Sequence, residues 1–211
     1  MPVSPSIVEP EADADGTEPR RRRKPLTADD RRAAIIEATT PLIAERGPSV
    51  TSAEIAEAAG IAQGTIFHVF GDKQALVDAV VRHAMDITTL LVDLEGLTAE
   101  PDLQTRLGKA IAAVSAHMVK AMPVMMKCGK PKGDHDHALG PAADLRDSLA
   151  RLLEPDAATL AHPPAPMAAI IFGLCIASAQ QTAFGEAPMP SSGDLAELFL
   201  DGARIRQPPT A

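Results

Sequence analysis

Apolar residues recur at every third or fourth position through most of the chain, which is the spacing of amphipathic helices. The first such segment covers residues 28–45, with Thr27 as its N-cap and Arg46-Gly47-Pro48 as its stop signal. An interior proline, Pro41, removes one backbone hydrogen bond from this helix at a cost of about 3 kcal/mol. We therefore expect a kink or a local break near Ala38. The apolar stripe consists of Ala34, Ile35, Ala38, Leu42 and Ile43.

The same spacing predicts further helices, bounded by glycine and proline, at about residues 73–94, 102–121, 123–128, 140–153, 165–184 and 193–205. No alternating run of apolar and polar residues reaches useful strand length, and we find no internal repeat. The five Phe, with no Trp or Tyr, also disfavour a β-sandwich or β-barrel. The pattern therefore predicts an all-α fold of about nine helices.

Residues 51–73 contain two short helices joined by a tight turn. Thr51 and Glu54 have the spacing of a capping box, which starts a helix of about eight residues. Gly60 ends this helix where a positive φ is needed, and Gln63 begins the second helix. The pattern is that of a helix-turn-helix, although an ordinary αα-hairpin would bury the same apolar stripe. We favour the helix-turn-helix because a hairpin in a bundle would not need the residues on the open side of the second helix: Gln63, Gly64, Thr65 and His68.

Charge is distributed unevenly along the chain. The net charge is −8, from 20 basic and 28 acidic residues. Residues 1–19 carry five acids and no base, and we expect this segment to be disordered. Residues 20–85 hold ten basic and eight acidic residues, whereas residues 86–211 hold ten and fifteen, so the positive potential lies near the helix-turn-helix. It begins with an unbroken basic run, which consists of Arg20, Arg21, Arg22, Arg23 and Lys24.

Residues 27–76 resemble the DNA-binding head of the TetR family of bacterial transcriptional regulators. The segment EIAEAAGIAQGTIFHVFGDKQAL has the small-residue turn of the family, its Thr before an aliphatic and an aromatic residue, and its Phe and Lys after them. The family usually has Tyr where this chain has Phe67, so a phenolic contact to a phosphate is lost. The resemblance implies a ligand-responsive, homodimeric repressor. We divide the chain into a tail at 1–24, a helix-turn-helix domain at 25–72, and an effector-binding and dimerisation domain at 73–211.

The second helix of a helix-turn-helix lies in the major groove, with its amino-terminal turn towards the base edges. Gln63 is suited to a bidentate contact with adenine, and the glycine after it lets the backbone come close. His68 can donate to a base or a phosphate, the alternative being a solvated imidazole. The resemblance assigns phosphate contacts to Thr65 and Lys73, and the capped helix start at Thr51 adds another. The candidate DNA-contacting residues of the head are Thr51, Gln63, Gly64, Thr65, Phe67, His68 and Lys73.

The helix-turn-helix itself is poor in basic residues. Lys73 is the only lysine or arginine between Val50 and Leu76, so affinity for phosphates must come from elsewhere. We expect the basic run at residues 20–24 to enter the minor groove as an arm beside each recognition helix. The alternative is a solvated tail that pairs with the acidic segment before it.

The carboxyl-terminal helices are candidates for a dimer interface. Residues 157–185 contain no Asp, Glu, Lys or Arg, and their apolar residues surround the whole helix. Such a helix must be covered on both sides, either by its own core alone or by its core and a partner chain. We favour the partner chain, because a single head reads too few base pairs to be specific. The residues expected to face it are Ala169, Gly173, Ala177, Leu195, Leu198, Phe199 and Gly202.

A stripe of apolar residues along 103–126 ends in four methionines, which are flexible enough to line an adaptable pocket. Methionine stripes at helical spacing are also common in plain cores, and the pocket reading depends mainly on the family resemblance. We expect a small apolar effector in this pocket. The candidate pocket residues are Met118, Met122, Met125, Phe172 and Cys175.

Other functional classes have weaker support. Cys128, His135 and His137 in a loop rich in Gly, Pro and Lys have ligand types for a metal-responsive regulator, but their spacing does not preorganise a site. A helical adaptor without DNA binding is a further alternative. Catalytic motifs are absent, so neither an enzyme nor a cofactor is expected. The longest apolar stretch, residues 167–179, is too short for a membrane span, so we expect a soluble cytoplasmic protein.

Overall fold

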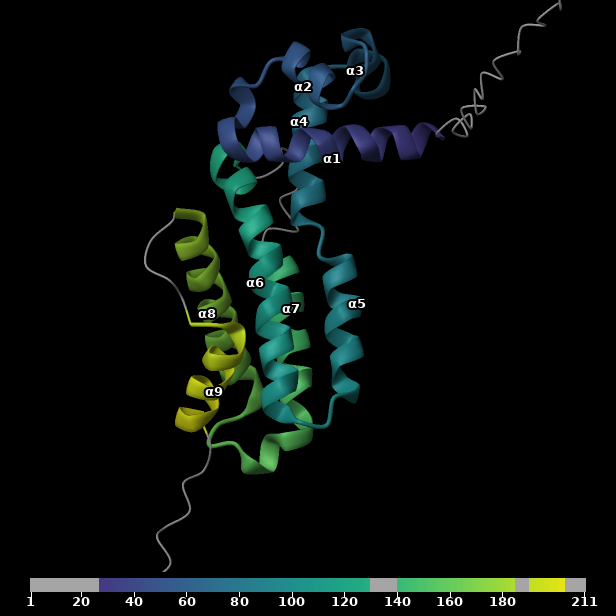
Figure 1. Cartoon of the computed structure of the whole chain (residues 1–211). Helices are drawn as coiled ribbons and strands as arrows, with labels where there is room; N and C mark the ends of the chain where they lie inside the picture. The colour runs from purple at the N-terminus through teal and green to yellow at the C-terminus, as the bar shows by residue number, and fades with distance from the viewer. Residues whose placement is uncertain (1–26, 130–139, 185–189, 204–211) are drawn as a thin grey trace, which may run out of the picture.

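The computed structural model describes residues 27–129, 140–184 and 190–203. The described residues form nine α-helices and three short 3₁₀ helices with no strand, which confirms the all-α prediction. A head of three helices lies at one end of an elongated bundle, and α4 and α6 run between the two (Figure 1). The helices are α1 Ala28–Arg46, α2 Ser52–Ala58, α3 Gln63–Phe70, α4 Lys73–Met85, α5 Thr88–Gly96, α6 Leu103–Cys128, α7 Gly140–Leu153, α8 Pro164–Phe184 and α9 Ser192–Ala203.

Helix α1 begins and ends where its caps predict, but it continues through Pro41. Thr27 and Asp30 form a capping box, in which each side chain accepts a hydrogen bond from the backbone N–H of the other residue. The break that we expected near Ala38 is absent. Pro41 and Glu37 both lie on the exposed side of the helix, so water can satisfy the carbonyl that the proline leaves without a donor.

Two further helix boundaries differ from the sequence prediction. Residues 73–94 form two helices, because the backbone of Asp86 is extended. The Asp86 carboxylate accepts two hydrogen bonds from Thr88, one from its backbone N–H at 2.9 Å and one from its hydroxyl at 2.6 Å. Residues 103–128, expected as two helices, form the single helix α6 through Pro123. Ala121 and Val124, on either side of that proline, are almost fully buried, and this packing outweighs the lost hydrogen bond.

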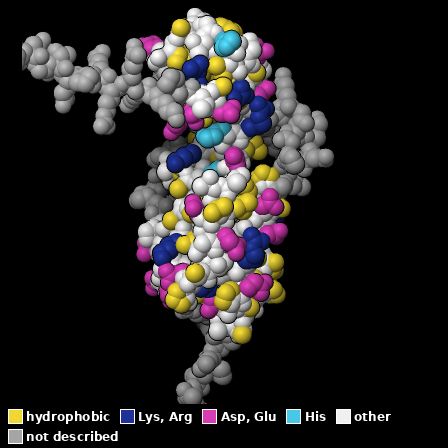
Figure 2. All heavy atoms as spheres, turned by 90° about the vertical axis from the view of Figure 1, so that its right-hand side faces the viewer, with side chains coloured by type: hydrophobic (Ala, Val, Ile, Leu, Met, Phe, Trp, Pro, Cys, Tyr) yellow, Lys and Arg dark blue, Asp and Glu magenta, His cyan; other side chains and the backbone are white. Residues whose placement is uncertain are grey.

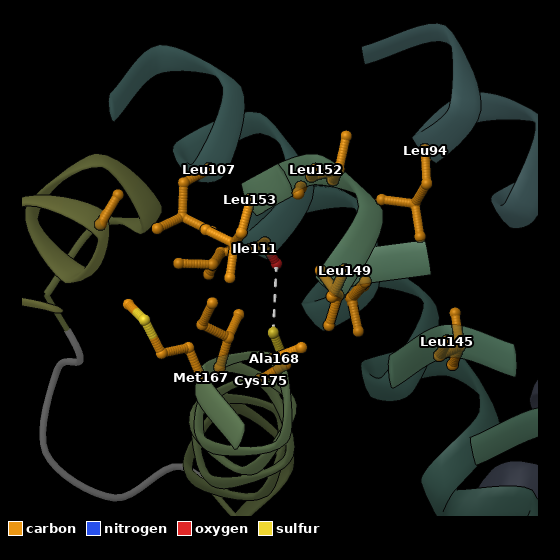
Figure 3. Close-up of a cluster of buried hydrophobic side chains, with 14 of the residues drawn as sticks. Leu94, Leu107, Ile111, Leu145, Leu149, Leu152, Leu153, Met167, Ala168 and Cys175 are labelled. Carbon is orange, nitrogen blue, oxygen red and sulfur yellow. Dashed lines mark hydrogen bonds between the residues drawn. The ribbon is translucent and has the colours of Figure 1, made fainter. Parts of the chain in front are cut away.

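The molecule has two hydrophobic cores, and α6 contributes to both. Figure 3 shows the bundle core, in which Leu107 and Ile111 of α6 meet residues of α7 and α8. The head core joins α1, α2 and α3 to buried residues of α4 as far as Val81, and it includes Val124 of α6. Helix α6 is therefore one continuous element that extends from the bundle core into the head core.

A buried arginine fixes the far end of the bundle. Arg106 is 2% exposed, and its Nε donates a hydrogen bond to the carbonyl of Leu152 at 2.9 Å. Its guanidinium also donates to the carbonyl of Glu100 and forms an ion pair with Asp156. These contacts tie the start of α6 to the end of α7 and to the 3₁₀ helix Glu154–Thr159.

Candidate DNA-binding surface and effector pocket

The start of α2 is fixed by the capping box that the sequence predicts. The hydroxyl of Thr51 accepts a hydrogen bond from the N–H of Glu54 at 3.3 Å, and the Glu54 carboxylate accepts from the N–H of Thr51 at 2.8 Å. Arg46 donates to the same carboxylate at 2.7 Å. The carboxylate also accepts from the Thr51 hydroxyl at 2.7 Å, and the bonds that it accepts, led by the one from the Thr51 backbone, lower the pKa of Glu54 to about 2. The helix start is thus held by a carboxylate that stays charged near neutral pH.

The turn between α2 and α3 closes in the way that a glycine permits. Gly60 has a φ of 65°, which is the left-handed conformation that its position requires. The N–H of Gly60 bonds the carbonyl of Glu57 at 3.1 Å, and the N–H of Ile61 bonds the carbonyl of Ala56 at 2.9 Å. This pair of bonds is a Schellman closure, and it turns the chain directly into α3. The predicted helix-turn-helix is confirmed.

Helix α3 buries one side and exposes the side that was predicted to contact DNA. Ile66 and Phe70 are 0% and 8% exposed and pack in the head core. On the other side Phe67 is 46% exposed, which is unusual for a large apolar side chain. Thr65 is half-buried. The exposed polar surface of the helix is formed by Gln63, Gly64 and His68.

The basic side chains around α3 are bound to the head itself. Lys73 donates from Nζ to the carbonyl of Pro48 at 2.6 Å, and Arg32 donates to the carbonyl of Val69 at 3.2 Å. Acidic and basic side chains are interspersed over the α5 side of the molecule, which Figure 2 shows. The basic run Arg20, Arg21, Arg22, Arg23 and Lys24 lies outside the described residues.

A largely apolar pocket of about 500 Å³ lies where the head meets the bundle. Of the predicted lining residues, Met118, Met122, Met125 and Phe172 do line it. Cys175 does not, and this prediction is wrong. Its side chain is fully buried in the bundle core, where Sγ lies 4.0 Å from the carbonyl oxygen of Ile111 and burial raises the thiol pKa to about 11 (Figure 3).

The pocket also contains residues that the sequence did not identify. Met85, at the end of α4, and Ile87 line it because the chain breaks at Asp86 and turns both towards α6. The sequence did contain a signal for this break, since an Asp two residues before a Thr can form a turn by accepting a hydrogen bond from the backbone two residues on. His117 of α6 is half-buried in the pocket wall. Burial lowers its pKa, an effect that the Asp86 carboxylate partly offsets.

Helices α8 and α9 present an exposed apolar face. Ile170 and Leu198 are 58% and 64% exposed, respectively. Leu195 is instead 7% exposed within the bundle core, so its predicted role in facing a partner chain is wrong: it lies on the side of α9 that packs against α6. Phe199 is half-buried against the bundle core. The other residues predicted to face a partner are exposed: Ala169, Gly173, Ala177 and Gly202.

Helix α8 is long and apolar enough, by composition alone, to cross a membrane over residues 164–182. Its inner side packs in the bundle core, and its outer side is exposed, so that 28% of this window is buried. The residues on that inner side are Met167, Ala168, Ile171, Cys175 and Ala179.

Of the three candidate metal ligands in the alternative metal-responsive reading, only Cys128 lies among the described residues. Cys128 ends α6 and packs against the head core, where burial raises its pKa. His135 and His137 lie outside the described residues. Among the residues that the structure does describe, no group of three His, Cys, Asp or Glu side chains is placed to hold a metal ion.

Known proteins share this head and this fold. Residues 35–80 match the model of the bacterial regulatory proteins of the tetR family. The HTH-type transcriptional regulator BetI of Burkholderia cenocepacia is 35% identical over 96 residues, which is 45% of this chain and 50% of BetI. The chain thus matches about half the length of this relative.

Solved structures match over most of the chain. A TetR-family regulator from Agrobacterium tumefaciens superposes with a TM-score of 0.62 at 18% identity, covering 85% of this chain and all of that one. The transcriptional regulator FadR from Bacillus subtilis, in complex with stearoyl-CoA, gives a TM-score of 0.55 at 16% identity over 80% of this chain and 95% of FadR. At these identities the likeness establishes a shared fold. The chain is therefore similar to the regulators of the tetR family in its head, and it shares the fold of these solved structures.

Proposed function

We propose that this protein is a sequence-specific transcriptional regulator that binds operator DNA as a homodimer and is released from it by a small molecule. The observation that carries the proposal is the exposed side of α3, where Gln63 and His68 are free of packed neighbours beside a glycine. A hairpin that only supported a bundle would not need these residues on its open side. The known relatives are regulators rather than enzymes, and a cytoplasmic location suits DNA binding.

The residues of α3 have distinct roles in the proposed complex. Gln63 reads adenine in the major groove, His68 donates to a neighbouring base or phosphate, and Gly64 allows close approach. Phe67 contributes apolar contact, for example with a thymine methyl group, in place of a phenolic hydrogen bond. No side chain caps the start of α3, so the N–H groups of Gln63 and Gly64 remain open to an acceptor on the DNA, whereas that of Thr65 donates to the carbonyl of Ala62.

The phosphate contacts require groups that also stabilise the head. Lys73 donates to Pro48, yet an ammonium has two further N–H donors for a phosphate. The hydroxyl of Thr51 is held in the capping box, so we assign its contact to the start of α2 as a whole. Thr65 is half-buried at the edge of the exposed side. The arm at residues 20–24 supplies the remaining positive charge.

Specific binding requires two heads, spaced about 34 Å apart to meet successive turns of the major groove. The exposed apolar face of α8 and α9 is the proposed interface, and Ile170 and Leu198 are its exposed large hydrophobic side chains. Each of these helices packs on α6 with its opposite side, so the face is free to meet a second copy.

The effector is proposed to bind the pocket between head and bundle. Its wall includes the end of α4 and the carboxyl-terminal half of α6, and both helices continue into the head core. An occupant that moves these helices changes the spacing of the two heads. The effector can change DNA affinity only if it binds more tightly to one spacing of the heads than to the other, the spacing that fits DNA or the spacing that does not.

The test is capture of genomic DNA fragments by the purified protein, followed by mobility-shift assays on the enriched sequence. Gln63→Ala and His68→Ala should each weaken the specific complex about tenfold, as expected for loss of one base contact. Gln104→Ala and His162→Ala in the bundle are the matched controls and should bind normally. Failure of the wild-type protein to enrich or shift any fragment would refute the proposal.

A further inference from the structure

The pocket wall has one chemical feature that separates it from a general apolar cavity. Among the described residues that line it, His117 is the only one whose side chain carries a conventional hydrogen-bonding group. The other described residues of the wall are aliphatic, aromatic or thioether, and no Asp, Glu, Lys or Arg among the described residues lines it. Five methionines contribute to it: Met85, Met118, Met122, Met125 and Met126.

This wall selects against charge. A carboxylate, phosphate or ammonium group that enters an apolar cavity gives up its hydration and requires a countercharge to replace it. The lining side chains offer no such countercharge, whereas the polarizable methionines adapt to apolar ligands of different shapes. A volume of about 500 Å³ is within the range of sites for drug-sized molecules.

His117 is placed to recognise one polar group. Its side chain is half-buried and forms no hydrogen bond with any other residue that the structure describes. Burial lowers its pKa, Asp86 opposes this change and Lys120 adds to it. The lowered pKa favours the neutral imidazole, in which one nitrogen donates a hydrogen bond and the other accepts one.

We infer that the effector is an uncharged, mainly apolar molecule whose hydrogen-bonding group, such as a hydroxyl or carbonyl, contacts His117. This inference rests on the proposed function only in treating the pocket as the effector site. An unpaired polar group in an otherwise apolar site discriminates between ligands, because a ligand without a partner for it leaves the imidazole unsatisfied.

The charge selection is tested with two dyes that share one aromatic skeleton. N-phenyl-1-naphthylamine is uncharged, and 8-anilinonaphthalene-1-sulfonate adds a sulfonate to it. The chain has no Trp or Tyr, so the fluorescence of each dye is measured without protein background. We expect saturable binding of the uncharged dye, about tenfold or more tighter than that of the sulfonate. Equal or tighter binding of the sulfonate, or no binding of either dye, would overturn the inference.

The role of His117 is tested by displacing the uncharged dye with 2-naphthol and with naphthalene. The wild-type preference for naphthol over naphthalene should fall about fivefold in His117→Leu, because one hydrogen bond is lost. Naphthalene should displace the dye from this variant as it does from the wild type, which shows that the pocket is intact. His162→Leu, at an exposed site outside the pocket, is the control and should keep the wild-type preference. An unchanged preference in His117→Leu would refute the assignment.

These measurements need no DNA, so the inference about the effector and the proposed function can be refuted independently of each other. If the uncharged ligands bind as expected but the protein shifts no genomic fragment, the proposed regulation fails and the chemistry of the pocket stands. If DNA binds specifically but the sulfonate dye is preferred, the inference about the effector fails alone.

Discussion

Gly47 joins the head to the carboxyl-terminal end of α6 through a contact that only glycine allows. Its φ of 63° and ψ of −151° lie in a region that other residues rarely occupy. A Cβ at this position would lie 3.0 Å from the Cβ of Lys127. The backbone conformation therefore favours glycine, and a side chain here would also force Lys127 to shift by a few tenths of an ångström.

Gly47→Ala should lower the free energy of unfolding by about 1–3 kcal/mol, because it adds backbone strain to a steric clash. Chemical denaturation followed by far-UV circular dichroism measures the change. Gly96→Ala is the matched control: Gly96 is helical, and nothing lies within 4 Å of an added Cβ, so its substitution should be neutral or stabilising. Equal stability of Gly47→Ala and the wild type would contradict this account.

Glu54 makes the start of α2 sensitive to acid. Its pKa is lowered to about 2 in the folded protein from a usual value of 4.5, so its contribution to stability is complete above the unfolded value. That contribution is lost as the pH falls from about 4.5 through about 2. Denaturation curves across this range should show a smaller loss of stability in Glu54→Gln than in the wild type.

Glu57→Gln provides the comparison, since Glu57 lies on the same helix but outside the capping box. It should retain the wild-type decline of stability with acid. If Glu54→Gln loses stability between pH 4.5 and 2 as steeply as the wild type does, the capping contacts do not control the acid response.

The pocket shows how far residue-level prediction reached. Helical spacing placed Met118, Met122 and Met125 on one side of α6, and this was confirmed. It could not decide which turn of α8 faces the same space, and Cys175 belongs to the bundle core instead. His117 was missed because an isolated histidine acquires meaning only from what surrounds it in the fold. The proposed DNA contacts of α3 remain predictions, since exposure alone does not establish binding.

At the scale of helices, the sequence predicted caps and glycine turns well and interior prolines poorly. Thr27, Thr51 and Gly60 mark their boundaries through local hydrogen bonds, which depend only on neighbouring residues. Pro41 and Pro123 end no helix. Pro41 is exposed, so water can satisfy the carbonyl that it leaves without a donor, whereas the residues beside Pro123 are buried by distant parts of the chain, which the local sequence does not show. Local sequence signals are therefore sufficient to predict a helix boundary only where tertiary contacts do not oppose it.

Pro41→Ala tests the cost of an interior proline directly. The residue is exposed, so alanine restores the hydrogen bond to the carbonyl of Glu37 without removing core packing. The free energy of unfolding should rise by about 1–3 kcal/mol in chemical denaturation. Pro101→Ala, before the start of α6, is the control and should not be stabilising. A loss of stability in Pro41→Ala would show that the proline is needed for the shape of α1.

At the scale of the whole molecule, the basic run that we propose for phosphate binding lies at residues 20–24, apart from the proposed recognition helix α3. Deleting residues 1–24 removes the basic run together with the acidic segment before it. The slope of log K against log salt concentration should become shallower by about 0.9 for each phosphate contact that is lost. Fluorescence anisotropy on one operator at several salt concentrations gives this slope. An unchanged slope would show that the basic run does not neutralise phosphates.

The exposed apolar face of α8 and α9 is the proposed dimer interface, and a dimer is needed for two heads to bind DNA together. Leu198→Lys places a charge at a position that is 64% exposed, so folding should be retained while association is weakened by an unpaired charge in the interface. Sedimentation velocity at micromolar concentration should show a dimer for the wild type and a 22.1 kDa monomer for the variant.

Val92→Lys, at a 67% exposed apolar position on α5, is the matched control and should remain dimeric. The monomeric variant should also lose specific DNA binding, because one head contacts a single half-site. A wild-type monomer, or a Leu198→Lys protein that is still dimeric, would move the interface away from this face.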